Sequence, residues 1–384
     1  MTLTATAGTA VESAVDAILE EVVRPNAPAV DRDGTFPDDN LAALGKAGLL
    51  GLTVAAEAGG GGQGMRAAAG VVERLAGACG STAMVTLMHY AGTAAIEAHG
   101  PDDVRREIGA GTHLTTLAFS EFGSRSHFWA PVGTATPQGE EVRLDARKSW
   151  VTSAGRADSY VWSSLPMSGE GPMTLWLVRN GSAGLTVAGD FDGLGLRGNG
   201  SRPMTAAGLT VHKGAMLGAD GAGLDLALTV PLPWFLVLNA AFCLGLADAA
   251  VAEATRHLTA TTLTHTGRAL RDAAVPRRDL ARLTVRTHAL RTFLGDTLTA
   301  LETGRADATL RVLQVKALAG DTVADVTDEA MRLCGGSAFR KELGLERMFR
   351  DARAARVMAP TSDALHDFVG RVSTGLPLLD EENR

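Results

Sequence analysis

Cysteine is scarce in this sequence of 384 residues. The chain contains only Cys79, Cys243 and Cys334, which are far apart and odd in number. None belongs to a CxxC pair or to a Cys/His spacing that suits zinc, so the sequence predicts neither a disulfide framework nor a metal site. We expect three buried thiols in a reducing compartment.

Long blocks of positive charge are missing as well. The formal net charge is −7, and no block of about five or more Lys or Arg residues occurs. This distribution argues against a nucleic acid or an anionic membrane surface as the main partner. A small molecule is the expected partner.

No segment predicts export or membrane insertion. The first residues, MTLTATA, lack a basic stretch followed by an apolar one, so we expect a cytoplasmic protein. The longest apolar stretch, residues 226–246, is interrupted by Pro231, Pro233 and Asn239. These interruptions favour a buried helix over a membrane span.

The spacing of apolar residues changes twice along the chain. It is helical up to about residue 107, alternates with polar residues from Thr115, and is helical again after Pro233. With 46% hydrophobic residues, the chain can bury a large core. The pattern predicts an α+β fold. Its expected parts are a helical domain at 1–113, a β-domain at 114–230 and a bundle at 231–384, with long helices near 234–264, 277–303 and 307–333.

Three segments carry a family resemblance. Residues 118–126 read AFSEFGSRS, and residues 148–155 read KSWVTSAG. Residues 333–339 read LCGGSAF and are followed by an RDA triplet at 350–352. In this order the segments resemble the T-E-x-G-x-G-S-D, K-x-W-I-T-N and G-G-x-G-[FY] … R-D-A elements of the acyl-CoA dehydrogenase family. The resemblance implies that fold, with a C-terminal four-helix bundle, FAD as cofactor, and a homodimer or homotetramer that shares FAD between subunits.

The first two segments supply the expected flavin contacts. Trp150 offers a plane and Thr152 a hydroxyl two residues later, which places both on one face of a strand. The resemblance implies that Trp150 and Thr152 contact the flavin and that Phe119 and Ser120 line its pyrimidine edge. It also implies that Ser126 lies near the flavin and the substrate thioester. The alternatives are a core tryptophan and an exposed loop serine.

The third segment supplies contacts from the C-terminal part of the chain. The resemblance implies that Gly335 and Gly336 meet the adenine half of FAD from the neighbouring subunit and that Thr361 contacts FAD. A pair of glycines lets a backbone approach a cofactor closely. It also serves as the end of a helix, and both roles are compatible.

The catalytic carboxylate of the family is missing. The family glutamate lies nine residues after the Arg of R-D-A, where this sequence has Ala359. Some members place it on the first long helix of the bundle, where this sequence has Phe235 and Leu236. Ala359 still has its backbone N–H, which in the family holds the substrate carbonyl together with a flavin ribityl hydroxyl. A site that polarises a carbonyl can therefore survive without its base.

Two further features bear on activity. The family arginine that meets the pyrophosphate of FAD is absent from residues 263–267, and Arg268 is its nearest substitute. Candidate acid–base groups are His89, His127 and His366. Of these we favour His89, on a helix that borders the expected active site, although an isolated histidine there is more often structural.

Three functions follow from this pattern. The first is an FAD-dependent oxidoreductase of acyl thioesters, bound to CoA or a carrier protein, with an atypical or missing base. The second is a flavin-dependent monooxygenase of the same fold, supplied by a reductase. The third is a thioester-binding relic without redox chemistry. The first is the leading interpretation.

Overall fold

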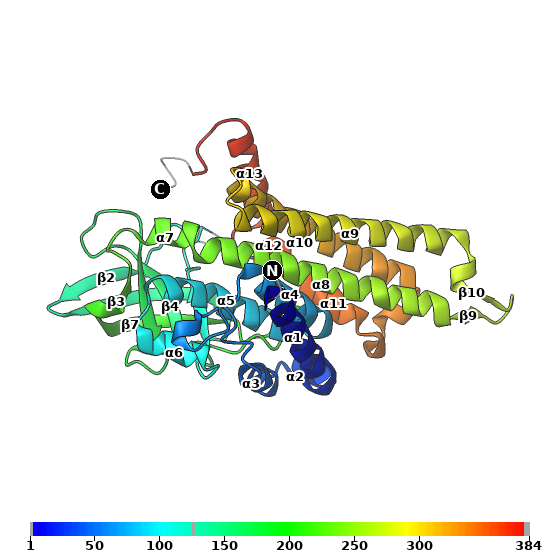
Figure 1. Cartoon of the computed structure of the whole chain (residues 1–384), viewed down its shortest axis with the longest axis horizontal. Helices are drawn as coiled ribbons and strands as arrows, with labels where there is room; N and C mark the ends of the chain where they lie inside the picture. The colour runs from blue at the N-terminus through cyan, green and yellow to red at the C-terminus, as the bar shows by residue number, and fades with distance from the viewer. Residues whose placement is uncertain (1–2, 125–126, 380–384) are drawn as a thin grey trace.

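Helix α5 (Gly80–His99) lies at the centre of the N-terminal unit, and three quarters of its residues are buried. Its apolar surface extends around most of its circumference, so neighbours cover it from several sides. The computed structural model describes residues 3–124 and 127–379. The other elements of this unit are α1 (Leu3–Ile18), a π-helical turn (Leu19–Val23), α2 (Arg24–Asp33), α3 (Asp38–Lys46), α4 (Met65–Ala78) and α6 (Asp102–Gly109) (Figure 1).

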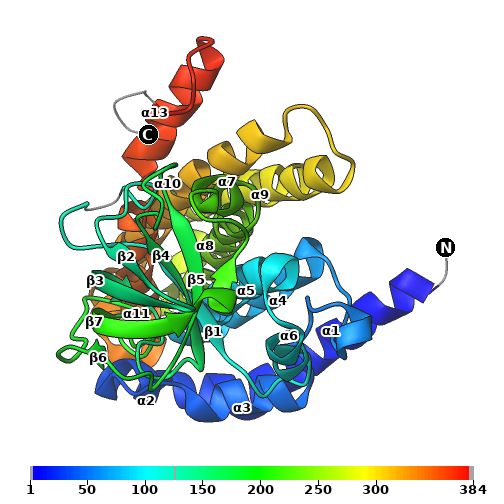
Figure 2. The ribbon, with the colours of Figure 1, turned by 90° about the vertical axis from the view of Figure 1, so that its left-hand side faces the viewer.

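The middle of the chain forms two four-stranded sheets, which lie together on one side of the helices (Figure 2). One has the order β1-β4-β5-β8, in which β1 pairs with β4 in parallel and the other pairs are antiparallel. The other is antiparallel throughout, in the order β2-β3-β7-β6. The strands are β1 (Thr115–Ala118), β2 (Thr134–Gln138), β3 (Glu141–Val151), β4 (Ser159–Ser164), β5 (Thr174–Arg179), β6 (Leu185–Val187), β7 (Arg202–His212) and β8 (Met216–Leu217).

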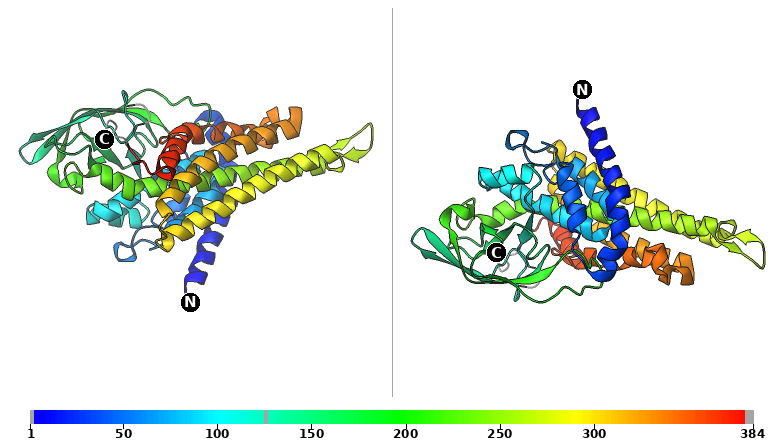
Figure 3. Two further views of the ribbon diagram at one scale, coloured as in Figure 1. Left: turned by 90° about the horizontal axis from the view of Figure 1, so that it is seen from above. Right: turned by 90° about the horizontal axis from the view of Figure 1, so that it is seen from below.

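Long helices form the C-terminal unit. Helix α8 (Pro231–Ala260) begins at a proline, whose fixed φ suits the first helical turn. It runs beside α4, α5, α9 and α10 and ends far from the sheets, at the β9–β10 hairpin (Figures 1 and 3). The remaining elements are α7 (Gly223–Thr229), β9 (Thr262–Leu263), β10 (Arg268–Ala269), α9 (Ala274–Glu302), α10 (Ala308–Cys334), α11 (Leu345–Ala352), α12 (Ala354–Val357) and α13 (Ser362–Ser373).

The structure confirms the α+β arrangement of helices, sheets and helices. Residues 223–260 are long and apolar enough to cross a membrane, but 78% of their most apolar window is buried inside the structure. The helix therefore packs in the core, as the prolines predict. The three cysteines are free and buried, also as predicted.

Candidate active site

Strand β3 is distorted at Trp150. Its pairing with β7 shifts register between Lys148 and Val151, and Trp150 has a φ of 54°. A positive φ is strained for a bulky residue, and such strain is a pointer to function. The Trp150 side chain is 70% exposed, whereas Lys148 is completely buried. The distortion turns a large flat ring out of the core, where it can contact a planar ligand.

The expected common face of Trp150 and Thr152 is wrong. Thr152 follows the end of β3 and is only 2% exposed. Its hydroxyl lies 3.3 Å from that of Ser201. Side chains alternate between faces only while regular pairing continues, and the register shift interrupts it. A bond from Thr152 to a flavin stays a prediction.

The segment after β1 lies directly beside the distorted end of β3. The Ser149 N–H donates to the Ser120 carbonyl over 2.9 Å, and the Phe122 N–H donates to the Arg147 carbonyl over 3.0 Å. Phe119 and Ser120 are half-buried. The structure thus brings the backbone of Ser120 against Ser149, the neighbour of Trp150, although the two segments are about 30 positions apart in the sequence.

A buried ion pair fastens these two segments together. The ammonium of Lys148 contacts the carboxylate of Glu121 and donates to both oxygens of Ser163, each over 2.7 Å. The other carboxylate oxygen of Glu121 accepts from the N–H groups of Val132 and Gly133. All donors of the lysine and both oxygens of the carboxylate have partners, as a buried pair requires.

Ser126 lies outside the described residues. The next residue, His127, is exposed. The Nδ1 atom of His127 is 3.0 Å from the Ser124 carbonyl oxygen. The His127 ring meets Trp129 edge-on at 5.0 Å between centroids.

Ala359 lies in the turn between α12 and α13 and is half-buried. In the part of the chain that the structure describes, its amide N–H makes no hydrogen bond. Thr361 begins α13, and its Oγ1 accepts from the Ala364 N–H over 3.2 Å. The hydroxyl of Thr361 still has its own proton to donate. The turn therefore keeps one backbone donor and one hydroxyl donor for a ligand.

Lys316 donates hydrogen bonds to the backbone of this turn. It is on α10, completely buried, and its Nζ donates to the carbonyls of Ala355 (3.0 Å), Met358 (2.9 Å) and Pro360 (2.7 Å). Burial lowers the pKa of Lys316 to about 8, although Cys243 and Asp321 oppose the shift. A lysine has three donors, and here all three go to the turn.

Helix α8 supplies no carboxylate near this turn. Phe235 and Leu236, the second position of the family base, are apolar and buried. Asn239 is also buried, and its Nδ2 contacts the Met358 sulfur at 3.7 Å.

The two glycines after α10 differ in what they require. Gly335 has a φ of 57°, which favours glycine, and it ends the helix. A Cβ added at Gly336 would meet nothing within 4 Å. Packing within the chain therefore does not explain Gly336, and close approach of another molecule remains its expected role. Phe339 nearby is 80% exposed.

His89 is placed as a structural residue, which corrects our preference for it as an acid–base group. It is completely buried; its Nε2 is 2.9 Å from the Leu50 carbonyl and its Nδ1 accepts from the Thr115 N–H. Burial lowers its pKa to about 4. Both ring nitrogens are used, so no lone pair is left for a substrate proton. His366 is exposed and pairs with Asp321 at 3.0 Å.

The hairpin β9–β10 occupies the place of the missing arginine motif. Arg268 is on β10 and is exposed. Its role toward FAD stays a prediction.

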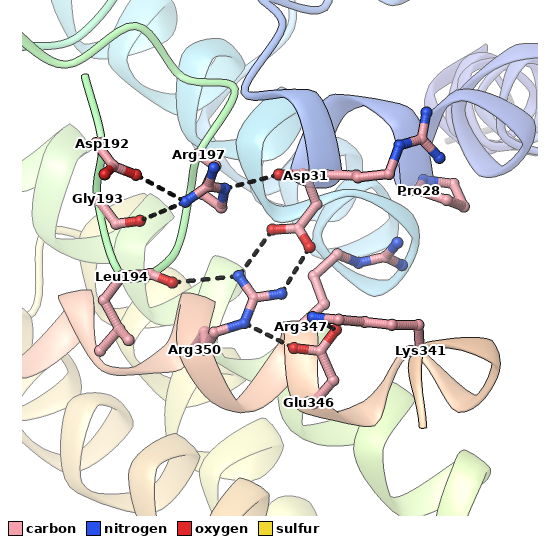
Figure 4. Close-up of a pocket in the computed structure, with 12 residues that line it drawn as sticks. Pro28, Asp31, Asp192, Gly193, Leu194, Arg197, Lys341, Glu346, Arg347 and Arg350 are labelled. Atoms are coloured by element: carbon pink, nitrogen blue, oxygen red, sulfur yellow. Dashed lines mark hydrogen bonds and ion pairs between the residues drawn. The ribbon is translucent and has the colours of Figure 1, made fainter. Parts of the chain in front are cut away.

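A cavity of 670 Å³ lies between α2, the loop at 192–197 and α11 (Figure 4). Arg350 of the R-D-A segment crosses it, with bonds of 2.8 and 2.6 Å to Asp31 and 2.7 Å to Glu346. Burial alone would raise the pKa of Asp31, but the bond from Arg350 together with the charges of Arg350, Arg347 and Lys341 outweighs burial and lowers the pKa of that carboxyl. None of the predicted flavin residues among those described lines this cavity. We interpret Arg350 as a clamp between units.

Asp351, next to Arg350, is buried without a countercharge in bonding contact. Its Oδ1 accepts from the Leu196 N–H over 2.6 Å. Burial raises its pKa to about 7, although this bond opposes the shift.

Sequence reasoning missed Lys316 and Glu121. A single lysine within the otherwise apolar face of α10 was a signal for Lys316, because a lysine is rarely buried without partners. No short motif marks its partners, which are backbone carbonyls about 40 residues away.

Known proteins resemble the chain along nearly its whole length. Residues 7–111 match the family described as acyl-CoA dehydrogenase, N-terminal domain, and residues 221–374 match acyl-CoA dehydrogenase, C-terminal domain. The chain is 28% identical over 356 residues to cyclohex-1-ene-1-carbonyl-CoA dehydrogenase of Geobacter metallireducens, covering 91% of this chain and 93% of that protein.

Solved structures share the fold. Butyryl-CoA dehydrogenase of Megasphaera elsdenii superposes with a TM-score of 0.90 at 21% identity, covering 96% of this chain and 98% of that one. The prolyl acyl carrier protein oxidase AnaB superposes with a TM-score of 0.86 at 17% identity, covering 94% and 98%. These likenesses confirm the predicted fold.

Proposed function

Because the chain belongs to the acyl-CoA dehydrogenase family, we propose that it is an FAD-dependent oxidoreductase of acyl thioesters that holds the substrate carbonyl at Ala359 and has no carboxylate base there. FAD is the cofactor of this family. The proposed substrate is a thioester of CoA or of a carrier protein, and the proposed assembly is a cytoplasmic homodimer or homotetramer. A separate protein would exchange electrons with it.

The residues present fit a flavin. Trp150 turns an exposed ring outward beside the half-buried Phe119 and Ser120. Gly336 leaves open space at its Cα. We therefore assign Trp150, Phe119, Ser120 and Thr152 to the ring of the flavin, and Gly335, Gly336 and Thr361 to its other contacts. When bound, FAD supplies a two-electron acceptor.

The unpaired N–H of Ala359 is the observation that carries the proposal. It is half-buried and makes no hydrogen bond within the described residues. A donor of this kind, fixed before the substrate arrives, polarises a carbonyl and can be worth several kcal/mol. It binds and orients the thioester, but alanine cannot accept the α-proton.

Replacing Ala359→Glu tests the proposal. We expect the purified variant with FAD to lose its yellow colour when butanoyl-CoA is added without oxygen, and the wild type to bleach far more slowly. The variant restores the one group that the site lacks for proton abstraction. If it holds FAD and binds butanoyl-CoA but does not bleach, the thioester function is wrong.

The apolar residues at both base positions favour a second candidate, a flavin-dependent monooxygenase. Such an enzyme needs no group to take an α-proton. Oxygen uptake driven by NAD(P)H and an added flavin reductase, with oxygen incorporated into an amine, thiol or aromatic compound, would support this candidate.

A further inference from the structure

We propose that Lys316 is a positioning residue that directs the Ala359 N–H toward the substrate carbonyl. This inference rests on the proposed thioester function. It concerns how a site without its base keeps its remaining polar group in place.

The geometry of one peptide bond carries the argument. The carbonyl of Met358 and the N–H of Ala359 belong to the same trans peptide unit, whose C=O and N–H bonds point in opposite directions. The Met358 carbonyl accepts from Lys316 Nζ over 2.9 Å. The Ala359 N–H therefore points away from Lys316 and from the interior of the bundle.

The same ammonium fixes the peptide units on both sides. It also donates to the carbonyls of Ala355 and Pro360, over 3.0 and 2.7 Å. Three carbonyls converging on one charged group leave the turn little freedom to rotate its peptide planes. The Ala359 N–H is thus fixed before a ligand arrives, which is the condition for strong carbonyl polarisation.

The charge of Lys316 has a second effect. A cation bonded to the Met358 carbonyl draws electron density along the peptide unit, and bonds in such a chain strengthen one another. The Ala359 N–H becomes a better donor. An apolar side chain of the same length would provide neither effect.

The surroundings of Lys316 contain no carboxylate in bonding contact among the described residues. From α8 it faces the thiol of Cys243, and on its own helix α10 Asp321 acts at longer range. Asp321 itself bonds Arg356 of α12 and His366 of α13. Within residues 3–124 and 127–379, the ammonium bonds only the carbonyls of Ala355, Met358 and Pro360, so these carbonyls fix its position and an ion pair does not.

The test measures the carbonyl of a bound thioester directly. Butanoyl-CoA labelled with ¹³C at the thioester carbon is bound to the FAD-containing wild type and to Lys316→Met, and its carbonyl stretch is recorded by isotope-edited infrared difference spectroscopy. We expect a shift to lower wavenumber in the wild type, and most of that shift to disappear in Lys316→Met. Affinity for butanoyl-CoA should weaken by about tenfold, as for one lost good hydrogen bond.

Val315→Ala is the matched control. Val315 is also completely buried on α10, but the helix turns by about 100° per residue, so its side chain points away from that of Lys316. This variant disturbs the same helix and should keep the full carbonyl shift. Amide hydrogen exchange of residues 355–361 without ligand should accelerate in Lys316→Met only.

If Lys316→Met does not fold, a pH titration of the wild type tests the same role. Burial lowers the pKa of Lys316 to about 8, so the carbonyl shift should diminish as the pH rises through this value, when one donor and the charge are lost. A carbonyl shift that stays constant while Lys316 loses its proton would overturn the proposal.

The outcomes separate the two claims. If butanoyl-CoA does not bind to the wild type, or binds without a carbonyl shift, the thioester function fails and the role of Lys316 fails with it. If the wild type shows the shift and Lys316→Met shows the same shift, the positioning role is wrong while the thioester function stands.

Discussion

Two lysines of this protein are completely buried, one in each half of the molecule. Lys148 lies in the β-domain and meets the carboxylate of Glu121, while Lys316 lies in the bundle and meets only backbone carbonyls. Burial lowers the pKa of each to about 8. The same cost of desolvation is thus offset in two ways.

The difference indicates two roles. Lys148 and Glu121 neutralise each other and hold β3 against the segment after β1. The ion pair therefore stabilises the backbone next to Trp150. Lys316 has no counterion and instead orients the turn at Ala359. We propose that the first lysine supports the flavin surface and that the second sets the direction of the Ala359 N–H.

Replacing Lys148→Met should give the largest effect. It leaves the buried carboxylate of Glu121 without a countercharge, so the free energy of unfolding in urea should fall by about 3–5 kcal/mol. The double variant Glu121→Leu with Lys148→Met removes both charges and should recover most of the loss. Equal losses in the single and double variants would mean that the pair is not coupled.

Asp351→Asn extends the comparison to a buried carboxylate. In the folded wild type, burial raises the pKa of Asp351 from 3.8 to about 7. The contribution of Asp351 to stability is therefore fully present below about pH 4 and is lost as the pH rises to about 7, because the folded state retains the proton that the unfolded state releases. Asn keeps the acceptor for Leu196.

We expect Asp351→Asn to match the wild type near pH 4 and to exceed it by about 2–4 kcal/mol at pH 8. Urea unfolding across this range measures the difference. A variant that is less stable than the wild type at pH 8 would show that the charged carboxylate is stabilised by its surroundings.

Lys316→Met should cost less stability than Lys148→Met. It leaves three carbonyls with one partner fewer but no unpaired charge, so we expect a loss of about 1–3 kcal/mol in urea unfolding. A loss as large as that of Lys148→Met would remove the contrast between the two sites.

Trp150→Ala should affect stability least. The ring is 70% exposed, so the free energy of unfolding should change by no more than about 0.5 kcal/mol. Retention of FAD, followed by absorbance after gel filtration, should nevertheless fall. Unchanged retention would remove Trp150 from the flavin site.

The sequence predicted the helices and strands because periodicity is a local signal. The helix expected at 307–333 spans residues 308–334, and the one expected at 277–303 spans 274–302. The prediction that Trp150 and Thr152 share a face was wrong, because the register shift there depends on the partner strand β7. His89 was misjudged for a similar reason, since the groups that occupy both its nitrogens come from Leu50 and Thr115.

The candidate site shows the same difference between local signals and contacts that join distant segments. The motifs predicted roles for Trp150, Ser120 and Ala359, and counting from Arg350 predicted that Ala359 stands where the family has its glutamate. The groups that hold these residues, Glu121 and Lys316, act across long stretches of chain and only the structure brings them there.

The visible spectrum of the purified protein mixed with FAD tests the central claim most directly. We predict a yellow protein with one flavin per chain, whose absorption bands shift when butanoyl-CoA is added. A colourless protein that cannot take up FAD would contradict the account, and a flavin spectrum unaffected by any acyl thioester would contradict its substrate.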